Sequence, residues 1–534
     1  MNAFIKRTLV VAMLVGTAAC QDLEITNLNL PDTERALSTP DAVQAVIETS
    51  FSIWWARIHG AGDAFWYFPA AANEVTHTVI SRSVQASFEP RLELNNDPIA
   101  ASVWIPRSAW DGFASGAANA NDGLRIIKNG MRIEVADAEG EVPTDQTDRA
   151  YTFAKIFQGI NLGYMGLVFD QSAPATEETF IDDAFWETGN LKPYPEVVAL
   201  GVRSLEEGIE RAQAGAQWLT KPSFIHMREY NNEQMIKFAN TMIARLLIYQ
   251  ARTPEERAQV DWQKVLSHTA GGLDFDFEVT LESGVITSAN SYYVDQLKGT
   301  STSSWRVDPH ILGLADVSGN YQAWLATDRD ERDGFLITTP DLRFQGPGGP
   351  TTAGAYFHYR TGWNTVADRG LYNRSSYGWY RRTHYGEGLW NTGFHRVATA
   401  DENRLYRAEA LLRTGNLQGA ADLINVTRTR GVRIGAVQFP TNLPPVTAQG
   451  VPQSDDCVPR TKTGACGSLL DALRYERTVE LFGWDAYRAW FDYRGFGMLP
   501  TGQAYHMPIP GRYLVSIGLP LYTFGGVGGD GAAS

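Results

Sequence analysis

Helical periodicity is the feature of this 534-residue sequence that most constrains its fold. Apolar and aromatic residues recur at helical intervals over residues 118–131, 148–169, 195–219 and 233–252. A Pro-Asp pair at 40–41 is suited to the first turn of an earlier helix. Recurrence near 3.6 residues predicts helices that bury one face and leave the other in water. The sequence therefore predicts a mainly α protein.

A pair of helices joined by a very short turn is predicted over residues 396–432. Thr399 and Glu402 have the spacing of a capping box, and Gly415 stands where the first helix should end. A second helix follows Asn416, and four small residues permit the two helices to pack closely: Ala408, Ala410, Ala420 and Ala421. Such a pair has about the length of one tetratricopeptide repeat, near 34 residues. The pattern indicates a helical hairpin of the tetratricopeptide type.

Residues 271–395 lack this periodicity and are dominated by Gly, Pro, Ser, Thr and aromatic residues. The chain has 15 Trp, 22 Tyr and 24 Phe, and a notable part of them lies here. A disordered segment would be depleted of aromatic residues. Long irregular segments in a compact protein are commonly functional. We therefore expect an ordered, loop-rich insertion with a few short strands that carries a ligand-binding site.

The N-terminus has the pattern of a bacterial export signal. Lys6 and Arg7 precede an apolar stretch at 8–17, and Ala18 and Ala19 stand before Cys20. The apolar stretch is too short for a bilayer span, which needs about 20 residues. A cysteine after small residues is typical of a lipobox, although Thr17 stands where Leu is usual. We predict a signal peptide at 1–19 and lipidation of Cys20; the alternative is an ordinary signal peptide cut near Ala19.

The two other cysteines, Cys457 and Cys466, flank a short loop. In an exported protein a close pair of this kind predicts a disulfide. A zinc site is the alternative, but it would need about four ligands, and the loop contains no histidine.

The charge balance limits the kinds of partner. The chain has 46 Lys and Arg against 60 Asp and Glu, for a net charge of −14. Nucleic acids and anionic lipid surfaces both attract basic proteins. The composition therefore argues against nucleic acid as a partner, and against membrane contact other than through the lipid anchor.

The sequence shows no catalytic motif in a suitable context. His-Glu-x-x-His and Gly-x-Ser-x-Gly are absent. Residues 526–531 match a dinucleotide-binding string, but the chain ends before a helix could follow. Residues 328–334 resemble a calcium loop, but Arg332 occupies a ligand position, so a solvated charged turn is expected. Carboxylate pairs of the kind used in glycoside hydrolysis stay possible, since the chain has many acidic residues. We predict no catalytic residue, cofactor or metal.

Aromatic clusters are the informative candidates for binding, because sugar rings stack on Trp and Tyr while polar side chains bind the hydroxyls. Trp54 and Trp55, at the end of a predicted helix, are expected in the core. Two other clusters lie in loop-like settings, and core packing is the alternative for both. The candidate ligand-binding residues are Trp66, Tyr67, Tyr377, Trp379, Tyr380 and Arg381.

Both ends of the chain resemble the RagB/SusD family of outer-membrane nutrient-uptake lipoproteins. The N-terminal LEITNLNLPDTERALSTPDAVQAVIETSF after the lipobox cysteine is similar to the start of that family. The C-terminal LRYERTVELFGWDAYRAWFDYRGFG, followed by HMPIP at 506–510, is similar to its closing motifs. The predicted hairpin resembles its tetratricopeptide element. The resemblance covers nearly the whole chain in order.

The resemblance implies a tetratricopeptide scaffold with an irregular ligand-binding part. It further implies a binding protein without catalysis that sits as a lid over a TonB-dependent barrel transporter and delivers glycans or peptides to it. The family's C-terminal motif residues are expected to be structural: Arg474, Glu476, Arg477, Asp492 and Arg494. Ligand residues vary within the family, so none is carried over.

The sequence thus predicts a surface lipoprotein of the outer membrane that captures a glycan or another oligomeric nutrient. An anchored polysaccharide hydrolase or lyase is the alternative. The expected parts are a signal peptide at 1–19, a lipid-anchored tether at 20–37, a helical tetratricopeptide-like part at 38–270, the ligand-binding insertion at 271–395, the hairpin at 396–432 and an irregular C-terminal SusD-like part at 433–534. Within the last part we expect a Pro-rich loop from about 433, a helix from Ser468 to about Gly483 and an irregular tail.

Overall fold

The structure is a computed structural model, and it describes most of the chain. The described residues are 36–59, 63–77, 94–100, 104–136, 138–179, 190–281, 305–360, 374–381 and 393–523, with the side chains of 63–66, 77 and 281 excluded. Cys20, the predicted signal peptide and almost all of the tether lie outside these residues, as does the side chain of Trp66.

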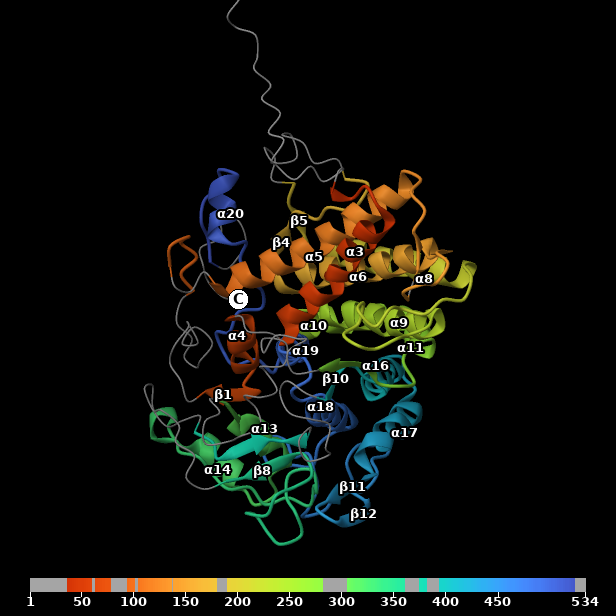
Figure 1. Cartoon of the computed structure of the whole chain (residues 1–534). Coiled ribbons are helices and arrows are strands. Elements are labelled where there is room, and N and C mark those ends of the chain that lie inside the picture. Colours follow the sequence, from red (N-terminus) through yellow and green to blue (C-terminus); the bar gives the residue numbers. More distant parts are fainter. Residues whose placement is uncertain are drawn as a thin grey trace, which may run out of the picture.

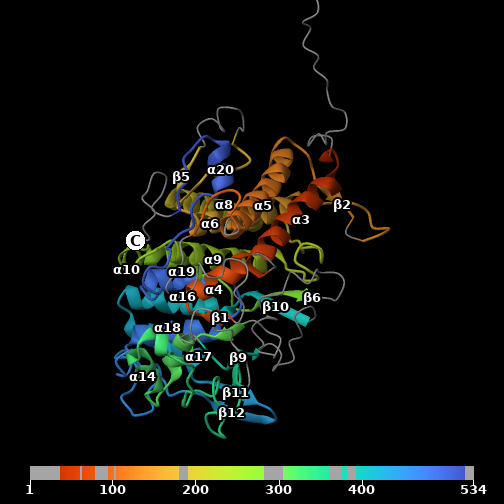
Figure 2. The same ribbon diagram turned by 90° about the vertical axis from the view of Figure 1, so that its left-hand side faces the viewer.

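Long helices from the first half of the chain pack on one another in the upper part of the molecule (Figure 1). They are α3 (Pro40–His59), α4 (Asp63–Ala71), α5 (Trp104–Lys128), α6 (Thr147–Val168), α8 (Tyr194–Ala214), α9 (Asn232–Tyr249), α10 (Pro254–Ala258) and α11 (Trp262–Ala270). Helices α6, α8 and α9 agree with the predicted ranges, whereas α5 begins well before the expected residue 118. Helix α4 was not predicted, because the aromatic cluster at 65–68 was expected in a loop-like setting. Figure 2 shows the same group from the side, with α5, α6 and α8 above α9.

Helix α6 lies at the centre of this group, against α5 on one side and α8 on the other. Nearly every residue of α6 is buried. Its glycines allow the close approach of α8: a Cβ added at Gly201 would lie 2.6 Å from the carbonyl oxygen of Gly159. Glycine is therefore required at this crossing because the two backbones almost touch.

The predicted helical hairpin is present as α16 (Ala400–Arg413) and α17 (Leu417–Arg428). The Thr399 side chain accepts a hydrogen bond from the Glu402 amide, and Gly415 adopts a φ of +90°, a left-handed value that favours glycine. The Glu402 side chain does not complete the capping box. It accepts two hydrogen bonds from Arg245 of α9 instead, at 2.7 and 2.8 Å.

The predicted boundary at 432 falls inside a β-hairpin. The second helix ends at Arg428 rather than near Gly431, and β11 (Arg430–Ile434) then pairs with β12 (Val437–Thr441) in antiparallel register. Because strands of five residues carry little periodic signal, the sequence suggested a loop where the hairpin forms.

Small sheets and short helices lie in the lower part of Figure 1, beside α17 and α18. Each sheet among the described residues has two antiparallel strands. The insertion contains β6 (Phe277–Leu281), β7 (Trp305–Val307), α13 (Pro309–Ala315), α14 (Asn320–Ala326), the 3₁₀ turn η4 (Arg329–Glu331), β8 (Phe357–Tyr359), β9 (Tyr377–Trp379) and the start of β10 (Gly393–Ala398). The remaining strands are β1 (Val75–His77), β2 (Glu134–Val135), β3 (Thr144–Asp145), β4 (Gln171–Ser172) and β5 (Lys192–Pro193).

The C-terminal part is more regular than expected. Helix α18 (Leu469–Glu480) begins with a complete capping box between Ser468 and Asp471, as its predicted range implies. Two further helices, α19 (Arg488–Phe496) and α20 (Gly511–Ser516), stand where an irregular tail was expected. The predicted disulfide between Cys457 and Cys466 is confirmed.

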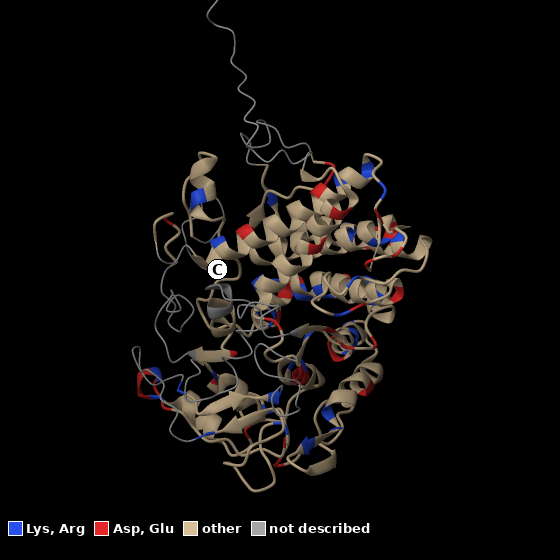
Figure 3. Cartoon of the chain, in the orientation of Figure 1, with Lys and Arg blue, Asp and Glu red and all other residues tan. Residues whose placement is uncertain are grey.

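A large hydrophobic core runs from α3 to α19, and a smaller one joins the α16–α17 hairpin to α18. Trp54 and Trp55 are fully buried in the large core, as predicted. Basic and acidic residues are intermixed over the helices (Figure 3). In the part of the chain that the structure describes, no helix combines the length and the apolar character that a membrane span requires.

Candidate functional site

The candidate site is built on strands β8 and β9 of the insertion, because β9 and the next two residues contain four of the predicted ligand-binding residues. Phe357 lies opposite Trp379, and Tyr359 lies opposite Tyr377. Side chains of opposed residues share one face of an antiparallel pair. These four rings therefore belong to one face of the β8–β9 pair.

That face is turned into the protein. Trp379 and Tyr377 are each 1% exposed. The Trp379 ring packs edge-on against Trp484, with the ring centroids 5.4 Å apart. The Tyr377 hydroxyl accepts a hydrogen bond from the Ile337 amide at 3.1 Å. In this arrangement neither ring has a free face for a ligand, and both set the position of strand β9.

Tyr380 lies just beyond β9 and remains half-buried. Its ring stacks on the His358 ring, with centroids 4.3 Å apart and an angle of 18° between the planes. The Tyr380 hydroxyl donates to the Gly354 carbonyl, and its amide donates to the Tyr356 carbonyl at 2.9 Å. The stacked rings of Tyr380 and His358 thus form a fixed aromatic platform, part of whose surface is exposed to water. Sequence reasoning did not select His358, although its position in the aromatic run FHYR was a usable signal.

Arg381 is held beside this platform by three contacts. Its guanidinium lies 4.0 Å from the centre of the Tyr356 ring. The same group donates to the Glu480 carbonyl at 2.9 Å and lies 3.1 Å from the Glu480 carboxylate. Burial raises the pKa of Tyr356, so its ring stays neutral beside the cation. The Arg381 side chain is 11% exposed, and through Glu480 it lies at the edge of a buried charge network.

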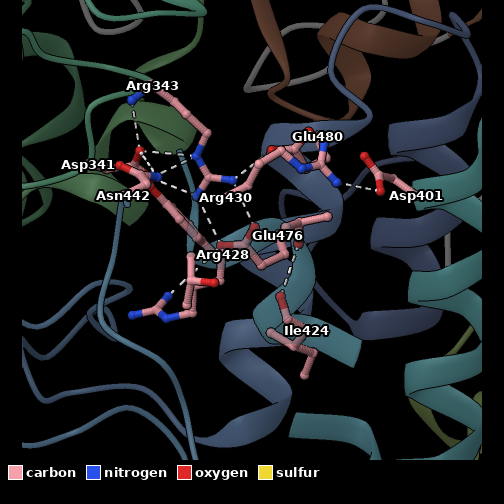
Figure 4. Close-up of polar contacts among 12 residues, drawn as sticks. Asp341, Arg343, Asp401, Ile424, Arg428, Arg430, Asn442, Glu476 and Glu480 are labelled. Carbon is pink, nitrogen blue, oxygen red and sulfur yellow. Dashed lines mark hydrogen bonds and ion pairs between the residues drawn. The ribbon is translucent and has the colours of Figure 1, made fainter. Parts of the chain in front are cut away.

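A buried charge network connects the insertion to α18 (Figure 4). Arg343 binds the carboxylate of Glu476 through two hydrogen bonds of 2.8 and 2.9 Å, donates to Glu480 at 2.9 Å and pairs with Asp341 at 2.8 Å. Burial alone would raise the pKa of Asp341, but Arg343 and the hydroxyl of Tyr475 lower it. Every charge in this network has a partner, so the network acts as a support for the site.

A second buried network joins the hairpin, α10, α18 and α19. Glu409 accepts from Arg257 at 2.7 and 2.9 Å and pairs with Arg477, while Asp492 lies 3.0 Å from Arg257 and 2.8 Å from Arg477. Arg494 donates to the carbonyls of residues 249 and 505, each at 2.8 Å. These contacts agree with the structural role implied for the C-terminal motif.

The other predicted cluster lies elsewhere in the fold. Tyr67 belongs to α4, is 1% exposed and packs edge-on against Phe68 at a centroid distance of 5.2 Å. The structure therefore brings Tyr377, Trp379, Tyr380 and Arg381 together and places Tyr67 on helix α4, in another part of the large core, where a loop-like setting was expected. Among the described residues, no group of three or more His, Cys, Asp or Glu side chains is arranged to hold a metal ion.

Comparison with solved structures identifies the fold. The chain resembles SusD superfamily proteins from Bacteroides vulgatus (TM-score 0.55), Bacteroides thetaiotaomicron (0.53) and Bacteroides fragilis (0.52), each at 12% identity. The matches cover 89–90% of this chain and 94–98% of those proteins. No family model and no curated protein sequence matches the chain. The protein has the SusD-type fold, as the sequence resemblance implied.

Proposed function

We propose that this protein is a lipid-anchored binding protein of the outer membrane that captures a glycan or another oligomeric nutrient. Two observations support the proposal. The chain has the SusD-type fold over nearly its whole length. The insertion presents the half-buried Tyr380–His358 platform beside Arg381, which suits an aromatic face and a hydrogen-bond donor to a sugar ring.

In this proposal the predicted residues have different roles, which depend on where each side chain lies. Tyr380 and Arg381 contact the ligand directly, while Tyr377 and Trp379 act through the position of β9. Tyr67 is a core residue of α4 with no part in the site. Trp66 stays a prediction, since its side chain is outside the described residues.

The test is ligand retention by the purified mature chain, residues 21–534, on affinity gels that contain a panel of polysaccharides. Tyr380→Ala should weaken retention by about 1–3 kcal/mol, the scale of a stacking anchor, with the unfolding temperature unchanged. Tyr151→Ala is the matched control, since Tyr151 is a half-buried tyrosine on α6. Equal weakening in both variants, or none in Tyr380→Ala, would contradict the proposed site.

The same incubations distinguish binding from catalysis. We expect retention without release of reducing ends, because the proposed protein binds and does not cleave. Release of reducing ends that is lost on substitution of single carboxylates would instead show a hydrolase or lyase.

The anchor and the partner are part of the proposal. We propose that lipidated Cys20 holds the protein on the outer face of the outer membrane, and that it delivers its ligand to a TonB-dependent barrel transporter. Cys20→Ser should move the protein from the membrane fraction to the soluble fraction. The transporter encoded beside it should co-purify with the wild-type protein, and failure to do so would contradict the partnership.

A further inference from the structure

A pocket lies far from the candidate site, between α5, α6 and α20. It has a volume of about 490 Å³. Its apolar walls include Trp110, Ala114, Ala117, Leu162, Met165 and Tyr513. Helices α5 and α20 stand at the upper end of the molecule, while β8 and β9 lie at its lower end (Figures 1 and 2). This pocket is therefore separate from the Tyr380–His358 platform.

The walls of this pocket are held in place by the surrounding core. The Trp110 ring packs edge-on against Phe169 and at a tilt against Tyr513, each at a centroid distance of 5.0 Å. Helix α20 is fixed at its start, where the Gly511 amide donates to the buried Asn96 at 2.9 Å. The small side chain of Ala114 leaves the space that a larger residue would fill. A pocket with fixed walls binds without a large ordering cost.

The polar groups of the pocket gather at one end. Asp122 and Arg125 form an ion pair at 3.1 Å. The Asn121 side chain donates a hydrogen bond to the Ala175 carbonyl at 2.8 Å and accepts one from Gln158. The remaining walls offer no series of hydrogen-bonding groups. A sugar carries hydroxyls around its whole ring, and each would need a partner on burial. The lining therefore favours a ligand with an apolar body and a single polar end.

The part of the pocket at Thr179 favours a negative charge on the polar group of the ligand. Thr179 lines both this pocket and a neighbouring hollow of about 400 Å³. The second hollow contains Lys192 and Arg203 against one carboxylate, Glu196. Both side chains are exposed, and neither side chain makes an ion pair or hydrogen bond with any residue that the structure describes. An anionic group at Thr179 would lie beside these cations in a protein whose net charge is −14.

We propose that this pocket binds an amphipathic organic anion. A ring system or short acyl chain occupies the space between Trp110 and Met165, and a carboxylate or sulfonate at Thr179 is oriented toward Lys192 and Arg203. Burial of the apolar body supplies most of the affinity, because apolar surface is removed from water. The charge selects anions over neutral molecules of the same shape.

Two fluorescent probes test the proposal on the mature chain. 8-Anilinonaphthalene-1-sulfonate carries an anionic group, whereas N-phenyl-1-naphthylamine has the same rings without it. We expect saturable one-site binding of the anionic probe, displaced by decanoate. Ala114→Leu should weaken binding of the anionic probe at least about tenfold, because the larger side chain fills part of the pocket. Ala214→Leu, at an exposed position on α8, should leave it unchanged.

A second pair of variants tests the charge. Lys192→Gln with Arg203→Gln should weaken the anionic probe about threefold or more at low salt and leave the neutral probe unchanged. Unchanged binding in Ala114→Leu, with the unfolding temperature preserved, would overturn the site. Equal affinity for the two probes would overturn the selectivity. Retention on polysaccharide gels should be unaffected by Ala114→Leu, so this result is separate from the test of the proposed glycan function.

Discussion

Removal of one negative charge from the second buried network should strongly destabilise the protein. Glu409 and its partners Arg257 and Arg477 are each 0% exposed. Glu409→Gln preserves the shape of the side chain but leaves two buried guanidinium groups with Asp492 as the remaining acidic partner between them. Loss of one partner of a buried pair costs about 3–5 kcal/mol, because the other charge stays in the core without compensation.

The lowered pKa of Glu409 corresponds to a similar contribution to the free energy of unfolding. Burial alone would raise this pKa, but Arg257 and Arg477 lower it from the ordinary value of 4.5 to about 2. At about 1.4 kcal/mol for each pH unit, that difference corresponds to about 3 kcal/mol of stability. Because the folded-state pKa is the lower one, this stability is fully present above about pH 4.5. It is lost as the pH falls toward 2.

Urea unfolding of both proteins, monitored by tryptophan fluorescence, measures the effect. We expect Glu409→Gln to lower the free energy of unfolding by about 3–5 kcal/mol at pH 7, and the difference to shrink between pH 4.5 and pH 2.5. Asp274→Asn is the control: Asp274 pairs with Lys237 at 2.8 Å but is 68% exposed, so its loss should cost at most about 1 kcal/mol. A loss below 1 kcal/mol in Glu409→Gln, or one independent of pH, would refute the reasoning.

Three further substitutions test the packing. Trp379→Ala should cost about 3–5 kcal/mol in chemical unfolding, since its ring is 1% exposed; an unchanged stability would place the ring outside the core. Gly201→Ala should cost about 1–3 kcal/mol because its methyl group would meet the Gly159 carbonyl of α6, and a neutral result would contradict the close crossing. Replacing Cys457 and Cys466 by serine should cost about 3 kcal/mol, the loop entropy of a nine-residue separation, measured as a lower unfolding temperature.

Long helices were predictable from the sequence, and most short elements were not. Helices such as α6 and α9 span five turns or more, so their apolar residues repeat often enough to be recognised. The seven-residue α13 and α14 and the six-residue α20 offer at most two turns, and they were missed. Local signals with a direct chemical cause also succeeded, as at the Thr399 cap, at Gly415 and at the disulfide.

The candidate site was predicted less well, because aromatic clustering does not distinguish a buried ring from an exposed one. Tyr377, Trp379 and Tyr380 stand within four residues, yet two are in the core and one is at the surface. Which ring is exposed depends on β8, on Trp484 and on Phe482, all distant in sequence. His358 is brought to Tyr380 by the same strand pairing.

By itself the sequence determined the helical class, the tetratricopeptide-type hairpin, the disulfide and the resemblance to a family of binding lipoproteins. Each of these depends on residues within one or two helices of each other, where periodicity and spacing carry the information. Only the tertiary structure decided which aromatic rings face water, how Glu480 connects Arg381 to Arg343, and that a pocket exists under α20. These features arise from contacts between residues far apart in the chain, such as Arg343 and Glu480, which are 137 positions apart, and no local pattern records them.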